Sequence, residues 1–125
     1  MEKAMRLAVE EVVQIDTRRL GGIMRDLGEP AARSLISRAI EQLGADMDSL
    51  AAAARANDLR QVSLAADRLS RDAWQIGLTT LSAVAVHAAD CARGGDGPAV
   101  AAVLARLDRV AAQSLHALRG GPEGG

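Results

Sequence analysis

The chain has 125 residues, which is enough for one domain with its own core. Hydrophobic residues make up 49% of it, yet it contains no Phe, no Tyr and one Trp, so the core must be aliphatic and rich in alanine. A net charge of −1 without an extended basic block argues against nucleic acid as a partner. The single cysteine, Cys91, cannot form an internal disulfide, and no apolar run or signal peptide indicates a membrane, so we expect a cytoplasmic protein.

Two short helices are predicted at the N-terminal end. The apolar residues of the first recur with helical spacing and are Met5, Ala8, Val9, Val12 and Val13. The second begins after Asp16, a favourable N-cap residue, and ends at Gly28. Its apolar stripe consists of Leu20, Ile23, Met24 and Leu27. We expect these two helices to pack across one end of the domain.

Two long amphipathic helices follow, each with apolar residues three and four positions apart. The first runs from Pro30 to about Arg55, and its apolar positions are Ile36, Ile40, Leu43, Met47, Leu50 and Ala54. The second is capped by Asn57 or Asp58 and ends near Gly77. Its apolar positions are Leu59, Val62, Ala66, Leu69, Ala73 and Ile76.

Two further long helices complete the pattern. One carries Leu81, Val84, Ala88 and Cys91, and the Gly-rich stretch 94–98 then forms a tight connection. The last helix carries Val100, Val103, Leu104, Leu107, Val110, Ala111, Leu115 and Leu118. Long amphipathic helices with short links predict an all-α fold, an antiparallel up-down-up-down four-helix bundle. Residues 1–119 would form this single domain, and residues 120–125 a flexible tail.

The segment Ala66–Gly77 resembles the signature of histidine-containing phosphotransfer (HPt) domains, which runs roughly His-x-Leu-Lys-Gly-x-Ala-x-x-x-Gly. Leu69, Ala73 and Gly77 stand where that pattern has leucine, alanine and glycine. The resemblance extends from about Ile15 to Leu118, although outside the signature it consists mainly of the helix plan. It implies a four-helix bundle that serves two-component phosphorelay signalling in the cytoplasm.

The phospho-accepting histidine of this family is replaced by Asp67 in the present sequence. A phospho-carrier needs a nucleophilic imidazole, and a carboxylate on a helix is a poor substitute for it. Ser70 and Arg71 replace the lysine and glycine that follow. The resemblance therefore implies a pseudo-phosphotransfer protein, not an enzyme, that binds a response-regulator receiver domain or a histidine kinase.

The candidate partner-binding residues are Asp67, Ser70, Arg71 and Trp74, whose spacing places them on one exposed face of their helix. Arg71 lies four residues after Asp67, the favourable order for an ion pair. Trp74 is the only aromatic residue, and tryptophan is frequent at binding hot spots. The alternatives are a solvated face with an ordinary helix pair and a tryptophan that covers the end of the core.

Three other interpretations remain. His87 and Asp67 are equally far from Gly77, so a helical hairpin could bring His87 beside the vacated position as a relocated phospho-acceptor. His116, near the end of the last helix, is expected on the surface. The chain could also be a structural bundle that self-associates. We find no residue pattern for a metal or cofactor: there is no Glu-x-x-His pair, Cys91 has no cysteine partner, and no Gly-rich phosphate loop is present.

Overall fold

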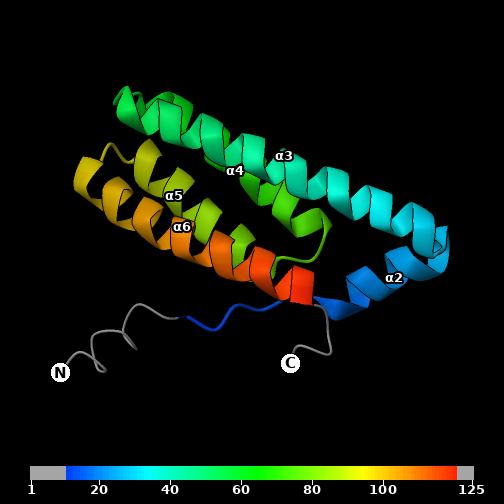
Figure 1. The fold of residues 1–125 in the computed structure, drawn as a ribbon. Coiled ribbons are helices and arrows are strands. Elements are labelled where there is room, and N and C mark those ends of the chain that lie inside the picture. Colours follow the sequence, from blue (N-terminus) through cyan, green and yellow to red (C-terminus); the bar gives the residue numbers. More distant parts are fainter. Residues whose placement is uncertain (1–10, 121–125) are drawn as a thin grey trace.

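The computed structural model describes residues 11–120, and this part of the chain is all-helical (Figure 1). Its five α-helices are α2 (Thr17–Leu27), α3 (Glu29–Arg55), α4 (Leu59–Gln75), α5 (Thr79–Arg93) and α6 (Gly97–Gly120). No strand occurs within these residues. The predicted all-α class is therefore confirmed, and the helices pack side by side as a bundle.

The helix boundaries follow the predicted capping residues. Asp16 begins α2 by accepting a hydrogen bond from the Arg19 backbone N–H, and Asp58 begins α4 in the same way, accepting from Gln61. Gly28, with φ +82°, is the single residue between α2 and α3. Prolines and capping residues thus mark where one helix ends and the next begins. Because the connections are short, consecutive helices lie next to each other.

The core lies mainly among α4, α5 and α6, with one side of α3 added. α4 packs most extensively on α5, and α3 packs on α4. Within residues 11–120, ten of the 22 buried apolar residues are alanines, which allow α4 and α5 to approach closely. The largest fully buried side chains in this core are Leu43, Leu69, Leu78, Leu81 and Leu107.

The prediction for the N-terminal end is partly wrong. α2 forms as expected, but it lies beside the first half of α3 and projects from the bundle instead of crossing its end (Figure 1). Residues 11–16, which include Val12 and Val13, are not helical. The rest of the predicted first helix, Met5, Ala8 and Val9, lies outside the described residues, as do residues 121–125 of the predicted tail.

Residues 11–16 are extended because they bind the connection between α4 and α5. The Asp16 N–H donates to the Gly77 carbonyl at 2.7 Å, and the Gln14 N–H donates to the Thr80 hydroxyl at 2.8 Å. Glu11 accepts a bidentate hydrogen bond from Arg106 of α6, which lowers the pKa of the Glu11 carboxyl. The hydrogen bonds of the Asp16 and Gln14 N–H groups replace those that the same groups would make inside a helix.

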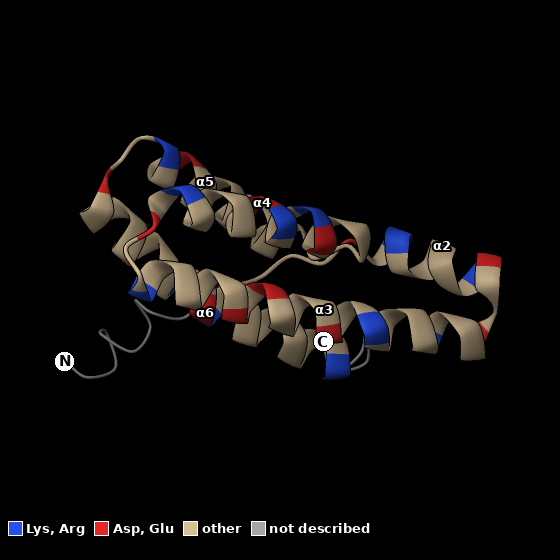
Figure 2. Cartoon of the chain, turned by 90° about the horizontal axis from the view of Figure 1, so that it is seen from above, with Lys and Arg blue, Asp and Glu red and all other residues tan. Residues whose placement is uncertain are grey.

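Acidic and basic residues are interspersed along the helices (Figure 2). Within residues 11–120, no helix is both long enough and apolar enough to cross a bilayer.

Candidate functional site on α4 and α5

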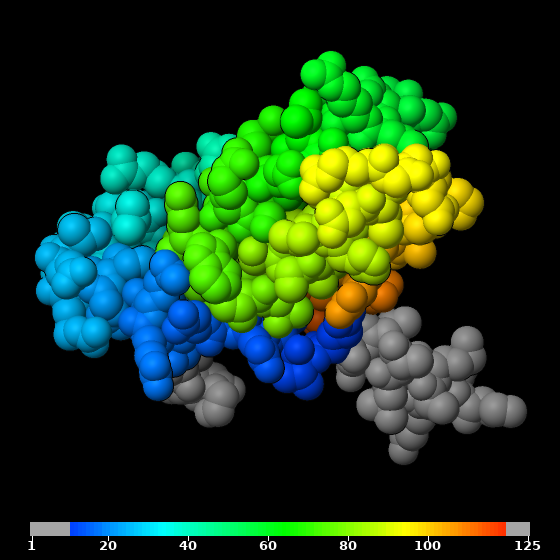
Figure 3. Space-filling model, turned by 180° about the vertical axis from the view of Figure 1, so that it is seen from behind, coloured from blue at the N-terminus to red at the C-terminus, as the bar shows by residue number. Residues whose placement is uncertain are grey.

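The outer face of α4 carries three of the four residues predicted to bind a partner. Ala66, Leu69 and Ala73 are buried, as their spacing predicted, and they turn the opposite side of α4 outward. α4 and α5 together form the middle of the surface seen in Figure 3. On this surface Asp67 is half-exposed, Arg71 is exposed, and Trp74 is 50% exposed.

Asp67 forms an ion pair, but with a different residue from the predicted one. Arg93 near the end of α5 donates to Asp67 Oδ2 at 3.1 Å, and it also donates to Asp90 Oδ1 at 3.1 Å. These two hydrogen bonds raise the pKa of the Arg93 guanidinium. The predicted ion pair between Asp67 and Arg71 is wrong, because Arg93 extends across the α4–α5 contact and pairs with the Asp67 carboxylate instead. Among the described residues Arg71 makes no ion pair.

Ser70 is turned toward α5 and is not part of the exposed face. Its hydroxyl lies 3.0 Å from the Ser82 hydroxyl, and the Ser82 hydroxyl also hydrogen-bonds the Ser70 carbonyl at 3.0 Å. Ser82 is buried and Ser70 is half-buried. Ser70 therefore joins the two helices, and its predicted place in an exposed binding surface is wrong.

Trp74 lies outside the core, and its ring contacts a residue of α2. The guanidinium of Arg19, in the first turn of α2, lies over the indole ring at 5.1 Å from its centroid. The start of α2 is held beside this ring because Asp16 is bonded to Gly77, at the end of α4. Half of the tryptophan surface stays open to solvent, so it is available to a partner.

The exposed apolar side chains of this face extend beyond the predicted residues. Leu64 is 40% exposed and lies one turn before Asp67 on α4, while Val86 is 45% exposed on α5. Leu64, Asp67, Arg71 and Trp74 recur at three and four residues, so they form one stripe. We define the α4–α5 face as this stripe together with Val86, Asp90 and Arg93.

His87 is exposed but does not belong to this face. It lies seven residues after Thr80 and three after Val84, which line a hollow with Arg106 of α6. Helical spacing therefore turns His87 toward α6, whereas Val86 and Arg93, seven residues apart, lie on the side nearer α4. Helical spacing thus places His87 and Asp67 on different sides of the α4–α5 pair. His116 is exposed, as predicted.

A buried acid lies away from this face, where α3 meets α4. Asp46 is only 2% exposed, and its Oδ1 accepts a hydrogen bond from Gln42 at 3.1 Å. Burial and a hydrogen-bonding contact with the carboxyl group of Asp72 raise the pKa of Asp46 to about 6. Asp46 lies three residues after Leu43 and four before Leu50, and this helical spacing is the sequence signal that places it on the buried side of α3.

No three histidine, cysteine or acidic side chains in residues 11–120 converge in a way that could hold a metal ion. We compared the chain with known families, curated proteins and solved structures, and none of them matches it.

Proposed function

We propose that this chain is a degenerate HPt-like module of two-component signalling that binds a receiver domain or histidine kinase and transfers no phosphoryl group. In this proposal α3, α4, α5 and α6 are the four antiparallel helices of an up-down-up-down bundle. Short connections and the order of contacts, α3 with α4, α4 with α5 and α5 with α6, support this topology.

The observation that carries the proposal is the position of Asp67. It lies on the outer side of the helix that carries the signature-like segment, while Leu69 and Ala73 of the same segment are fully buried. This is the arrangement expected if the scaffold of a phospho-carrier is kept and its reactive imidazole is lost. The Asp67 carboxylate accepts a hydrogen bond from Arg93, which makes it a poorer nucleophile still.

Docking would use the chemistry of the α4–α5 face. Trp74, Leu64 and Val86 supply exposed apolar area, and Arg71 supplies a cation with no ion-pair partner among the described residues. A receiver domain presents the aspartate that carries its phosphoryl group, so an arginine on the docking surface is complementary to it. Asp67 does not imitate a phosphohistidine in this proposal, because Arg93 offsets its charge.

The test is binding of the purified chain to a panel of receiver domains and kinases from the same cell, measured by calorimetry, with each receiver also offered in its labelled, phosphorylated form. We expect at least one receiver or kinase to bind and no label to reach the chain. Transfer of label to the wild-type chain that is lost in His87→Asn would overturn the proposal and establish a relocated acceptor. Failure of every receiver and kinase to bind would also contradict it.

Self-association is the second candidate function, and α2 is the observation that favours it. No residue of α2 is buried, and Met24, Leu27 and Leu35 expose apolar surface where α2 meets the first half of α3. A short amphipathic helix gains most of its stability from a covered apolar side. A molecular mass in solution that increases with concentration, without affinity for any receiver, would support this alternative.

A further inference from the structure

The contact between α3 and α4 contains an acid with an incomplete set of hydrogen bonds. Asp46 of α3 is buried, Gln42 satisfies its Oδ1, and its Oδ2 is buried without a hydrogen-bond partner in the described residues. Asp72 of α4 faces it with a second carboxyl group. Two carboxyl groups hydrogen-bond each other only when one of them holds a proton. A proton on Asp46 would therefore complete the contact.

The other charged group that acts on Asp46 is Arg68 of α4, which favours the ionised carboxylate. Its effect is smaller than those of burial and of Asp72. Within the described part of the chain no further acid, base or histidine on α2, α5 or α6 acts on Asp46. The protonation of the pair is thus decided at the α3–α4 contact itself.

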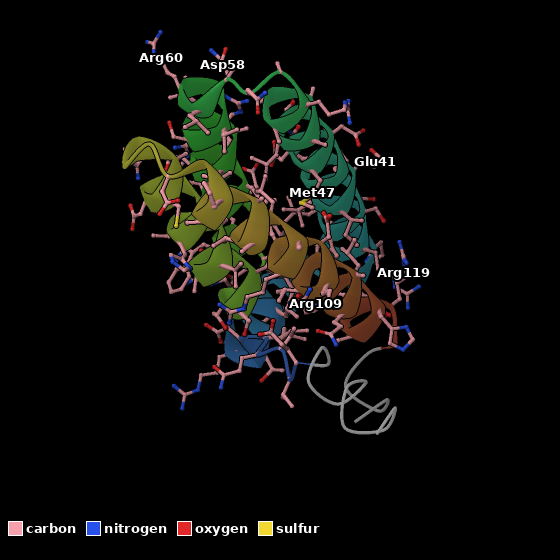
Figure 4. All side chains as sticks on the ribbon, turned by 90° about the vertical axis from the view of Figure 1, so that its left-hand side faces the viewer. Glu41, Met47, Asp58, Arg60, Arg109 and Arg119 are labelled. Atoms are coloured by element: carbon pink, nitrogen blue, oxygen red, sulfur yellow. The ribbon has the colours of Figure 1, made fainter. Side chains whose placement is uncertain are left out.

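α3 is held on the bundle mainly through its contact with α4. It packs extensively on α4, but α3 and α6 make little direct contact, and a groove of about 390 Å³ lies between them. Met47 of α3 and Leu104 of α6 line this groove, and Met47 points from α3 into it (Figure 4). α2 packs on α3 and is joined to it through Gly28, whereas the start of α2 is held at the end of α4 by the Asp16–Gly77 hydrogen bond and by the contact of Arg19 with Trp74.

We propose that the Asp46–Asp72 pair makes the attachment of α3 to the bundle depend on a proton. With a proton on Asp46, α3 stays packed on α4. When both carboxyl groups are ionised, two like charges face each other in a poorly solvated contact, and α3 opens away from α4 more often. The inference is independent of the proposed docking function, because it concerns the opposite side of α4.

Amide hydrogen exchange at about pH 5 and about pH 7.5, corrected for the intrinsic pH dependence of exchange, tests this proposal on the full chain. The pKa of Asp46, about 6 in place of an ordinary value near 4, spans about two pH units. We therefore expect the protection of α3 amides to fall by up to about a hundredfold between the two conditions. Protection of α5 and α6 amides should change far less.

Asp46→Asn supplies the decisive variant, because asparagine is close in shape, cannot ionise and can donate to Asp72. Its α3 amides should be equally protected at both pH values. Asp48→Asn is the matched control: Asp48 is exposed, two residues further along α3, and its variant should keep the wild-type pH dependence. Protection of α3 that does not change with pH in the wild type, that changes as much in Asp46→Asn, or that falls equally in all helices would overturn the proposal.

Discussion

Arg93 of α5 donates hydrogen bonds to both Asp67 and Asp90, at 3.1 Å each, and so links the outer sides of α4 and α5. One guanidinium thus faces two carboxylates on the surface that we propose for docking. Arg93→Gln would uncover both acids and make this surface more negative. If the partner presents an acidic site, binding should weaken, and the loss should shrink at high salt because exposed charges are screened.

Calorimetric titration of the same receiver at low and high ionic strength measures this effect. Arg109→Gln is the control, since Arg109 is an exposed arginine on α6, outside the α4–α5 face. Equal or tighter binding of Arg93→Gln at low salt would show that the partner is not acidic at this point.

Trp74→Ala should weaken receiver binding by about 30-fold or more, as expected for a hot-spot tryptophan worth about 2 kcal/mol. Because half of Trp74 is exposed and its ring contacts Arg19, the helical circular-dichroism signal and the thermal midpoint should change little. Gln75→Ala, an exposed neighbour on α4, is the matched control. A Trp74→Ala protein that loses its cooperative thermal transition would assign the tryptophan to the core instead.

Gly77→Ala should destabilise the fold by about 2–4 kcal/mol in chemical denaturation. Gly77 has φ +82°, and a Cβ atom there would lie 2.8 Å from the Asp16 carbonyl oxygen, so the backbone that binds residues 11–16 would have to move. Gly95→Ala has a similar φ of +73° with no atom within 4 Å, and should cost only about 1 kcal/mol. Equal losses in the two variants would mean that the contact with Asp16 contributes nothing.

Asp46→Asn should stabilise the protein at neutral pH. The folded state holds a proton on Asp46 up to about pH 6, whereas an unfolded aspartate releases it near pH 4, so the wild-type free energy of unfolding falls as the pH rises through this window. The penalty above pH 6 is up to about 3 kcal/mol, and it is absent below about pH 4. Urea denaturation between these limits should show a slope in the wild type that Asp46→Asn lacks. A wild-type free energy that rises through the window would contradict the raised pKa.

The helix boundaries could be predicted because their causes are local. Asp16 and Asp58 cap the helices that follow them, and Gly28 and Gly77 adopt positive φ where helices end. Most of the apolar positions that spacing predicts for α4 are buried, since a helix in a bundle buries one side, but Ser63 and Ala65 are buried as well and the spacing did not predict them. Each of these features is determined by a few residues that are neighbours in the sequence.

The errors arose where a distant segment competes with a local partner. Arg71 is the closer basic residue to Asp67 in sequence, but Arg93 reaches it across the helix contact. Residues 11–16 have an apolar pattern that fits a helix, yet their backbone binds the connection at Gly77 and Thr80. The small polar side chain of Ser70 is typical of a surface position, and nothing in its own helix indicates that Ser82 lies opposite it. To predict such contacts, one must know how two helices are aligned with each other. The sequence pattern of a single helix does not contain this information.

Phosphoryl transfer from a labelled receiver that binds the chain tests the central claim most directly. The wild-type protein and the triple variant Asp67→His, Ser70→Lys, Arg71→Gly are compared, because the variant restores the three residues that the HPt-like pattern has at these positions of α4. We expect both to bind the receiver and only the variant to take up acid-labile, base-stable label. Label on the wild-type chain, or a variant that binds and stays unlabelled, would contradict the assignment of Asp67 to the position of a lost phospho-acceptor.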